Sequence, residues 1–173
     1  ILTIVENYGV DTFYRDKYYD DYSTISEATI YTLQNLSSNA KTVFQLMPNC
    51  PLRNAKDIRN SLRNFSKINA HSQISCCEFM WMNPWWGFVK KEESYEKIFP
   101  EKSQSRSQDE SKVFFPTGAI WVGDIDILLK ENSFYTGEES YYPLSFRSSI
   151  DIDNYEDLDL ARALFDNNVS EDL

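Results

Sequence analysis

Two aspartates near the end of the chain, Asp151 and Asp153, have the spacing of a metal-binding pair. They alternate with isoleucines, which predicts a strand over 146–153 with the aspartates on one face and the isoleucines in the core. Neighbouring carboxylates repel each other unless a cation lies between them. Mg²⁺ fits, because it binds one or two carboxylates and keeps positions for phosphate oxygens. The alternative is a solvated strand end that leads into a helix capped by Asn154.

A second group of candidates lies nearer the amino end, where Arg15 precedes Ser23 and Thr24. Thr24 and Glu27 have the spacing of a capping box, so we expect a helix to begin there. An arginine and two hydroxyls at a helix N-terminus could bind a phosphate or a base, because the free N–H groups there favour anions. The alternative is that Thr24 serves only to cap its helix.

Several aromatic side chains could also belong to a binding site. Trp121, Phe134 and Tyr135 could form the wall of a pocket or be ordinary core. Three tryptophans and a phenylalanine fall within 81–88. They form either core or a partner surface. The stretch 83–111, which contains three of these four residues, is interpreted as an excursion from the main sheet.

The composition limits the partners of the chain. Its 173 residues carry a net charge of -10, from 17 Lys+Arg and 27 Asp+Glu, which excludes nucleic-acid binding by a general electrostatic route. No apolar run approaches the ~18 residues of a membrane span. Three cysteines, two of them adjacent, suit neither a disulfide framework nor a zinc site and favour a cytoplasmic location. The single histidine excludes a multi-histidine metal site.

The elements that position these residues alternate along the chain. Strands are predicted over 42–47, 72–81, 117–122 and 146–153, with a short one near 11–14. Helices are predicted to begin at Thr24, Asn54, Asp124 and Asn154. This alternation predicts an α/β fold with a mostly parallel sheet flanked by helices, in which ligands bind at the carboxyl ends of strands. Arg53 follows such an end and could bind an anion or pair on the surface.

The opening ILTIVENYG is typical of the last turns of a helix that stops at Gly9. No N-cap precedes Ile1, so we expect residues 1–173 to be a single domain that lacks its natural start. The alternative is a short helix with a frayed end.

Three segments in this order resemble the acylneuraminate (CMP-sialic acid synthetase) cytidylyltransferase family. They are LMPNCPLRNAKDI, RSQD…PTGAIW and SFY…SIDIDNYEDLDLARAL. The opening ILTIVENYGVDTFYR and a D-x-S-T-like segment at 21–24 extend the resemblance over essentially the whole chain. It implies a nucleotide-diphospho-sugar-transferase-like (Rossmann-like) fold. It also implies a nucleotidyltransferase reaction in which CTP and a nonulosonic (sialic-type) acid give CMP-sugar and pyrophosphate.

The resemblance also implies roles for individual residues. Asp151 and Asp153 match the catalytic, Mg²⁺-binding aspartates of the family. Three residues match positions that contact the nucleotide: Arg15, Ser23 and Thr24. Five match positions around the sugar: Arg106, Thr117, Trp121, Phe134 and Tyr135. The stretch 83–111 matches the region in which the family forms its homodimer contact.

The chain departs from the family pattern in several places. The first strand and phosphate loop of the family would lie before Ile1. Met47 stands where many members have glutamine, and Cys50 stands for the usual serine. Thr117 replaces asparagine and Trp121 replaces tyrosine. The sugar could therefore be a nonulosonic acid other than N-acetylneuraminate.

The alternatives to this enzyme are a degenerate, non-catalytic sugar- or nucleotide-binding or dimeric scaffold protein, and a transferase for another nucleotide or sugar.

Overall fold

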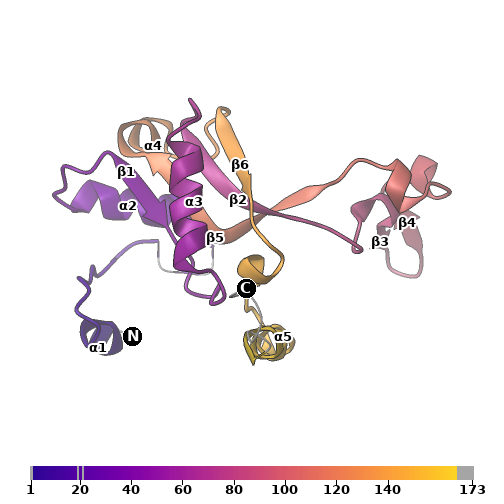
Figure 1. Cartoon of the computed structure of the whole chain (residues 1–173), viewed down its shortest axis with the longest axis horizontal. Coiled ribbons are helices and arrows are strands. Elements are labelled where there is room, and N and C mark those ends of the chain that lie inside the picture. The colour runs from indigo at the N-terminus through magenta and orange to yellow at the C-terminus, as the bar shows by residue number, and fades with distance from the viewer. Residues whose placement is uncertain (1, 19, 21, 167–173) are drawn as a thin grey trace.

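The computed structural model describes residues 2–18, 20 and 22–166. The helices are α1 (Leu2–Glu6), α2 (Ile25–Asn35), α3 (Ala55–Phe65), α4 (Ile125–Glu131) and α5 (Tyr155–Asp166). The main sheet contains β1 (Thr42–Gln45), β2 (Ser72–Glu78), β5 (Phe114–Asp124) and β6 (Glu139–Pro143), while β3 (Phe88–Lys90) and β4 (Tyr95–Lys97) form a separate pair. Figure 1 shows this pair held away from the main sheet.

The main sheet is mixed, with strand order β1-β5-β2-β6. Within the described residues β2 and β6 run parallel, whereas β5 is antiparallel to both β1 and β2. The prediction of a mostly parallel sheet is therefore wrong for this part of the chain, although the α/β class is confirmed. The reason lies in the connection between β2 and β5. The chain leaves the sheet at the end of β2 and re-enters it beside that end as β5, so the two strands run in opposite directions.

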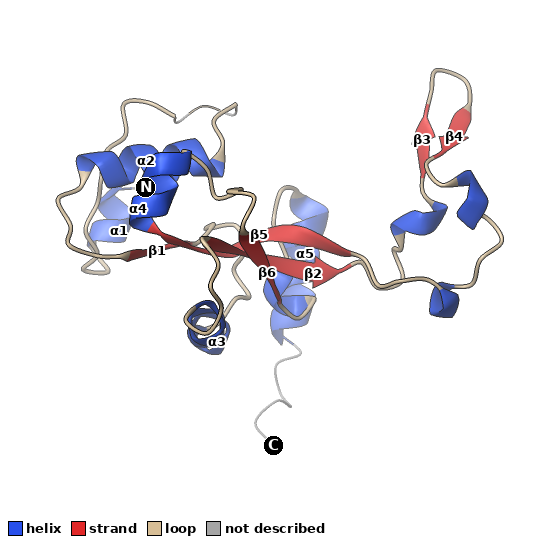
Figure 2. Cartoon of the chain, turned by 90° about the horizontal axis from the view of Figure 1, so that it is seen from above, coloured by secondary structure: helices blue, strands red, loops and turns tan. Residues whose placement is uncertain are grey.

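Helices cover both faces of the sheet (Figure 2). On one face, Ile74, Trp121, Leu128 and Phe134 form a buried cluster next to α2 and α4. On the other face, a cluster formed by Cys50, Ala119, Ile120 and Val122 packs against Ile58 and Phe65 of α3. Since burial of apolar surface stabilises the fold by roughly 25 cal/mol per Å², these two clusters fix the sheet between its helices.

The predicted helix starts are confirmed. Thr24 and Asn54 each close a capping box with the acid three residues later, and Asp124 accepts from the backbone N–H of Ile127 at 3.1 Å. Asn154 caps α5 through the backbone N–H groups of Glu156 and Asp157. Side-chain caps of this kind satisfy N–H groups that have no partner within the helix.

The spacing of apolar residues also predicts a buried face at Ile58, Leu62 and Phe65 on α3. Ile58 and Phe65 pack against the core, but Leu62 is 40% exposed. On α5 the same argument predicts a buried stripe at residues 160, 161, 164 and 165. It is correct for Ala161 but wrong for Leu160 and Phe165, which are 41% and 62% exposed. The short strand predicted near 11–14 is also absent, since this segment has no regular structure.

The last predicted strand, over 146–153, is wrong as well. Residues Arg147–Ser149 form a 3₁₀ turn, and residues 150–153 are irregular. The turn is stabilised by serines: Ser145 Oγ accepts from the Ser148 backbone N–H at 3.1 Å, and Ser149 Oγ donates to the Ser145 carbonyl at 2.8 Å. The strand that completes the sheet is β6, which lies earlier in the chain.

Residues 83–111 form a projecting arm, which contains the β3–β4 pair and short 3₁₀ turns (Figure 1). The arm has a small core of its own, in which the rings of Trp85 and Phe99 lie 5.1 Å apart. Lys102 lies 5.5 Å above the Trp85 ring and pairs with Glu110 at 2.6 Å. The excursion predicted from the sequence is thus an arm with internal packing.

In the part of the chain that the structure describes, no helix has the length and apolar character needed to cross a membrane.

Candidate active site

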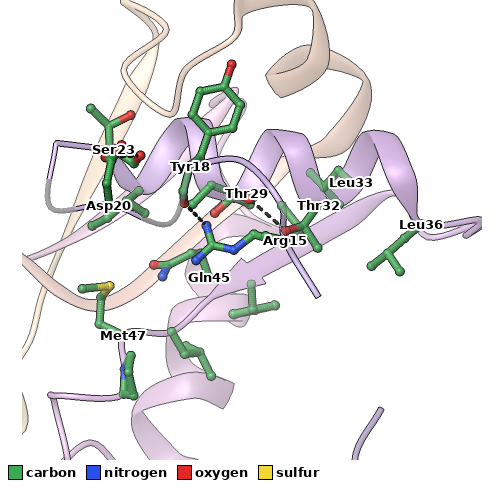
Figure 3. A pocket seen from close by; sticks show the side chains of 17 residues that line it. Arg15, Tyr18, Asp20, Ser23, Thr29, Thr32, Leu33, Leu36, Gln45 and Met47 are labelled. Carbon is green, nitrogen blue, oxygen red and sulfur yellow. Dashed lines mark hydrogen bonds between the residues drawn. The ribbon is translucent and has the colours of Figure 1, made fainter. Parts of the chain in front are cut away.

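A cavity of about 580 Å³ lies between the 15–24 segment, α2 and β1. Its lining includes the three residues predicted to contact a nucleotide: Arg15, Ser23 and Thr24. Figure 3 shows side chains from α2 and β1 on its walls, with Arg15 projecting between them. The structure therefore brings these three predicted residues to one cavity.

Hydrogen bonds within the 15–24 segment shape the rim of this cavity. Arg15 donates from Nη1 to the Tyr18 carbonyl at 2.7 Å. The hydroxyl of Ser23 donates to Asp20 at 2.8 Å, and this bond lowers the pKa of the Asp20 carboxyl. The remaining guanidinium N–H groups of Arg15 are donors suited to an anion or a carbonyl oxygen.

Thr24 has the capping role that the sequence left open as its alternative function. Its hydroxyl accepts from the Glu27 backbone N–H at 3.1 Å and donates to the Glu27 carboxylate at 2.8 Å. The Glu27 carboxylate also accepts from the Thr24 backbone N–H, and these bonds lower the pKa of Glu27. Capping and cavity lining are therefore combined in one residue.

Gln45, which the sequence analysis did not single out, lies in the wall of the same cavity. Its Oε1 atom is buried and has no hydrogen-bond partner among the described residues. The only signal in the sequence is an amide inside the otherwise apolar run TVFQLM. An unsatisfied buried acceptor is uncommon in folded proteins.

The two predicted metal-binding aspartates lie beside the loop that follows β1. Asn49 donates from Nδ2 to Asp153 Oδ1 at 3.4 Å, and its carbonyl accepts from the Ile152 backbone N–H at 2.9 Å. The Cys50 thiol lies 3.8 Å from Asp151 Oδ1. The loop after β1 thus lines one end of the cavity and also contacts the aspartate segment. That segment is irregular and does not form the strand that the sequence predicted.

The electrostatics of this pair fit a cation. Partial burial raises the pKa of Asp151, and the neighbouring Asp153 raises it further. No cluster of three or more His, Cys, Asp and Glu side chains suited to a metal occurs among residues 2–18, 20 and 22–166. At this position the described chain has two carboxylates, and the nearby Oδ1 atom of Asn49 is buried without a partner among the described residues. Such a sparse oxygen set suits Mg²⁺, which keeps water and phosphate ligands.

The aromatic residues predicted around the sugar form one group. The ring of Trp121 makes edge-to-face contacts with Phe134 and Tyr135, with centroids 5.3 and 5.6 Å apart. Trp121 Nε1 donates to the Thr117 carbonyl at 2.7 Å. Phe134 is fully buried and Tyr135 is 48% exposed. Only Tyr135 of this group presents a large surface to solvent, and the others support it from the core.

Thr117 is buried, and its hydroxyl bonds to Ser75 Oγ at 2.7 Å. Its side chain therefore belongs to a buried polar network between β2 and β5.

The two predicted arginines outside the cavity have different surroundings. Arg106 lies on the arm, where its guanidinium forms a two-point contact with Asp109 at 2.7 and 2.9 Å. Arg53 is half-buried and donates to the carbonyls of Met47 and Ala119 at 2.9 and 2.7 Å. Through these bonds Arg53 ties the loop after β1 to β5, and its role in binding an anion stays a prediction.

Met47, at the position where the family often has glutamine, lies against Gly118 of β5. Its backbone N–H donates to the Gly118 carbonyl at 3.2 Å. A Cβ atom on Gly118 would lie only 2.8 Å from Met47 Cγ and 3.8 Å from Cys50 Sγ. Glycine thus allows this close approach between the loop and the sheet.

Comparison with curated proteins finds relatives over most of the chain. It is 27% identical over 171 residues to pseudaminic acid cytidylyltransferase from Campylobacter jejuni subsp. jejuni serotype O:23/36, covering 95% of this chain and 73% of that protein. The same enzyme from serotype O:2 matches with the same identity and coverage. N-acylneuraminate cytidylyltransferase from Streptococcus agalactiae serotype V is 26% identical over 109 residues, covering 62% of this chain and 26% of that protein.

No model of a protein family matches the chain. Among solved structures, CMP:2-keto-3-deoxy-manno-octonic acid synthetase complexed with CTP superposes with a TM-score of 0.58 at 11% identity, over 84% of this chain and 69% of that one. The 4-diphosphocytidyl-2C-methyl-D-erythritol synthase of Anaerococcus prevotii gives 0.62 at 13% identity, over 95% and 74%. The chain is therefore a relative of the CMP-nonulosonate cytidylyltransferases and has the nucleotidyltransferase fold that its sequence motifs predicted.

Proposed function

We propose that the protein is a cytidylyltransferase that activates a nonulosonic acid. In this reaction a sugar hydroxyl oxygen forms a bond to the α-phosphorus of CTP. The bond from that phosphorus to the bridging oxygen breaks, and pyrophosphate leaves. The hydroxyl proton passes to the solvent or to a base. The main demands on the protein are alignment of the two substrates and neutralisation of negative charge.

One structural observation carries this proposal. The loop that follows β1 lines the cavity and also holds the aspartate segment, through the bonds of Asn49 and Cys50. A nucleotide bound near Arg15 would therefore extend its phosphates towards Asp151 and Asp153. In this arrangement Arg15, Ser23 and Thr24 orient the nucleotide by hydrogen bonds.

Asp151 and Asp153 would hold the divalent cation, with Mg²⁺ as the expected ion. Bound there, the cation would neutralise charge on the phosphate oxygens. Burial raises the pKa of Asp151, and repulsion by Asp153 raises it further. This repulsion would fall when such an ion binds. Asn49 keeps Asp153 in place from the opposite loop.

For the sugar side, we propose that Tyr135 contacts the substrate and that Trp121, Phe134 and Thr117 support it from beneath. Arg106 suits a sugar carboxylate through its two-point geometry, but the arm carries it away from the aromatic group of its own chain (Figure 1). It would reach a sugar only in a second copy. We therefore propose a homodimer in which the arms contact the partner. Side chains on or next to the arm are exposed as this requires, with Trp81 at 82% and Phe88 at 60%.

Pyrophosphate release tests the proposed reaction. The full chain is incubated with CTP, MgCl₂ and either pseudaminic acid or N-acetylneuraminate, and release is expected only when all three components are present. Asp151→Asn and Asp153→Asn should each reduce turnover by at least about 100-fold. Asp159→Asn serves as the matched control, because Asp159 is exposed and pairs with Arg162 on the surface of α5.

Two results would contradict the proposal. Wild-type turnover in either aspartate variant would remove the metal assignment. Nucleotide binding without pyrophosphate release with any sugar would instead support the non-catalytic binding protein. UTP and GTP are assayed beside CTP. Faster pyrophosphate release with either of them would indicate a related transferase that uses another nucleotide.

A further inference from the structure

The fold leaves Gln45 with an unsatisfied polar atom inside the cavity. Its Oε1 atom is buried and accepts no hydrogen bond from any described residue. Among the described residues, Asn49 Oδ1 beside the aspartate pair shares this condition, whereas the buried amide of Gln73 bonds to Asn64 and Ser61 at 2.6 to 3.0 Å. A buried acceptor without a partner destabilises a fold, so the position of Gln45 calls for a donor from outside the chain.

The surroundings of Gln45 indicate what kind of ligand supplies this donor. Gln45 pairs with Trp121 across the sheet, so its side chain lies on the face covered by α2. The side chains that α2 and β1 contribute to the cavity wall are uncharged and include Thr29, Thr32, Leu33 and Val43. Arg15 projects into the same cavity (Figure 3). Neutral walls with a few polar groups suit an uncharged ring that carries hydrogen-bonding edges.

The position of Gln45 along the chain orients the ligand. Asn49 lies four positions after it, a span of about 13 Å if the chain is extended at about 3.3 Å per residue. Asn49 bonds to Asp153, so the proposed cation site lies at one end of this span and Gln45 at the other. If the phosphates of the nucleotide lie at the aspartate end, its base lies at the end of Gln45.

We propose that Gln45 reads the base: its Oε1 atom accepts a hydrogen bond from the exocyclic amine of cytosine. This inference rests on the proposed function, which supplies the cytidine nucleotide. Uracil carries a carbonyl oxygen in place of the amine, and this oxygen would face the acceptor without a bond. Rotation of the amide lets Nε2 donate to uracil instead, so Gln45 contributes a moderate preference for CTP of about tenfold.

Equilibrium binding of CTP and UTP to the full chain tests the inference without a need for turnover. Affinities are measured by calorimetry in MgCl₂ for wild type, Gln45→Met, Gln45→Glu and Gln34→Met. Gln45→Met removes the amide at similar length and should weaken CTP binding about tenfold while changing UTP binding less than about twofold. Gln45→Glu keeps the acceptor but adds charge, so both nucleotides bind more weakly and the preference for CTP remains. Gln34→Met, an exposed position on α2, should match wild type.

The possible outcomes separate this inference from the proposed function. If wild type binds neither nucleotide, the proposed function fails. If wild type prefers CTP and Gln45→Met weakens both nucleotides equally, the proposed function stands and the role of Gln45 in base selection is wrong. A titration with 2′-deoxy-CTP tests whether Gln45 contacts the ribose instead. The base assignment is overturned if wild type binds 2′-deoxy-CTP more weakly than CTP, whereas Gln45→Met binds both equally and still prefers CTP to UTP. Thermal unfolding of each variant confirms that it is folded.

Discussion

The thiol of Cys50 and the carboxylate of Asp151 lie 3.8 Å apart, although 101 residues separate them in the sequence. Cys50 is fully buried and belongs to the core cluster beneath the sheet. The position of Asp151 is therefore coupled to the core through a side chain that cannot move independently. The geometry of the aspartate pair should depend on the packing of the whole domain as well as on its own loop.

The aspartate pair should respond to divalent cations in the absence of substrate. Asp151→Asn removes one charge. It therefore removes both the cost of partly burying this carboxylate and its repulsion by Asp153. Because Asp151 is exposed, solvent screening keeps this gain below about 1 kcal/mol, or about 2 °C in Tm without added metal. MgCl₂ should raise the Tm of wild type and leave that of the variant unchanged. An equal response of both proteins to MgCl₂ would disprove the assignment.

Arg53 should be a determinant of stability. Replacing it by methionine leaves the Met47 and Ala119 carbonyls without their charged donor, which we expect to lower the free energy of unfolding by about 3 kcal/mol. Urea unfolding followed by tryptophan fluorescence measures the change. Arg59→Met, an exposed position on α3, is the matched control and should change stability by less than about 0.5 kcal/mol. Similar losses in both variants would show that the two carbonyl contacts have no special weight.

The buried cysteines should resist alkylation in the native protein. Burial and the nearby Asp151 raise the pKa of Cys50 to about 11, and burial raises the pKa of Cys76 and Cys77. The reactive thiolate becomes more abundant as the pH rises, so labelling should be slow at neutral pH and should accelerate towards pH 11. At pH 8, Cys50 should react about 100-fold more slowly than an unfolded cysteine. Iodoacetamide labelling followed by mass spectrometry measures this difference, and rapid native labelling would contradict the burial.

The arm should determine the oligomeric state. Trp81→Glu places a charge at a side chain that is 82% exposed, so it should leave the fold intact while it weakens a dimer that buries this surface. Light scattering coupled to size-exclusion chromatography measures the mass. Tyr155→Glu, at a tyrosine of α5 that is 86% exposed, provides the control at another face and should leave the mass at the wild-type value. A monomeric wild-type protein would contradict the dimer.

The sequence was most informative where a local interaction determines the structure. The caps at Thr24, Asn54 and Asp124 use side chains within three residues of the N–H groups that they satisfy, so the sequence alone locates these helix starts. The strand predicted over 146–153 was wrong because alternating apolar residues there imitate a strand. Serine hydrogen bonds turn the chain instead, and β6 pairs with β2 through contacts that local sequence does not reveal.

The candidate site could be predicted only in part. The motif resemblance pointed to Asp151 and Asp153, and the structure brings their segment to the loop after β1. The sequence did not identify Gln45, because only the three-dimensional packing shows that its buried oxygen has no partner among the described residues. The sequence also could not predict that Arg53 bonds to backbone carbonyls, since the two carbonyls that accept from Arg53 lie in distant parts of the chain.

The close approach of Met47 to Gly118 links two positions that sequence motifs treat separately. A side chain at position 118 would collide with Met47 unless that residue became smaller or moved. Changes at these two sites are therefore expected to occur together in evolution. In an engineered variant, glutamine at position 47 should be accepted only while glycine is kept at position 118. The packing of Met47 against Gly118 therefore limits which side chains the loop after β1 can carry.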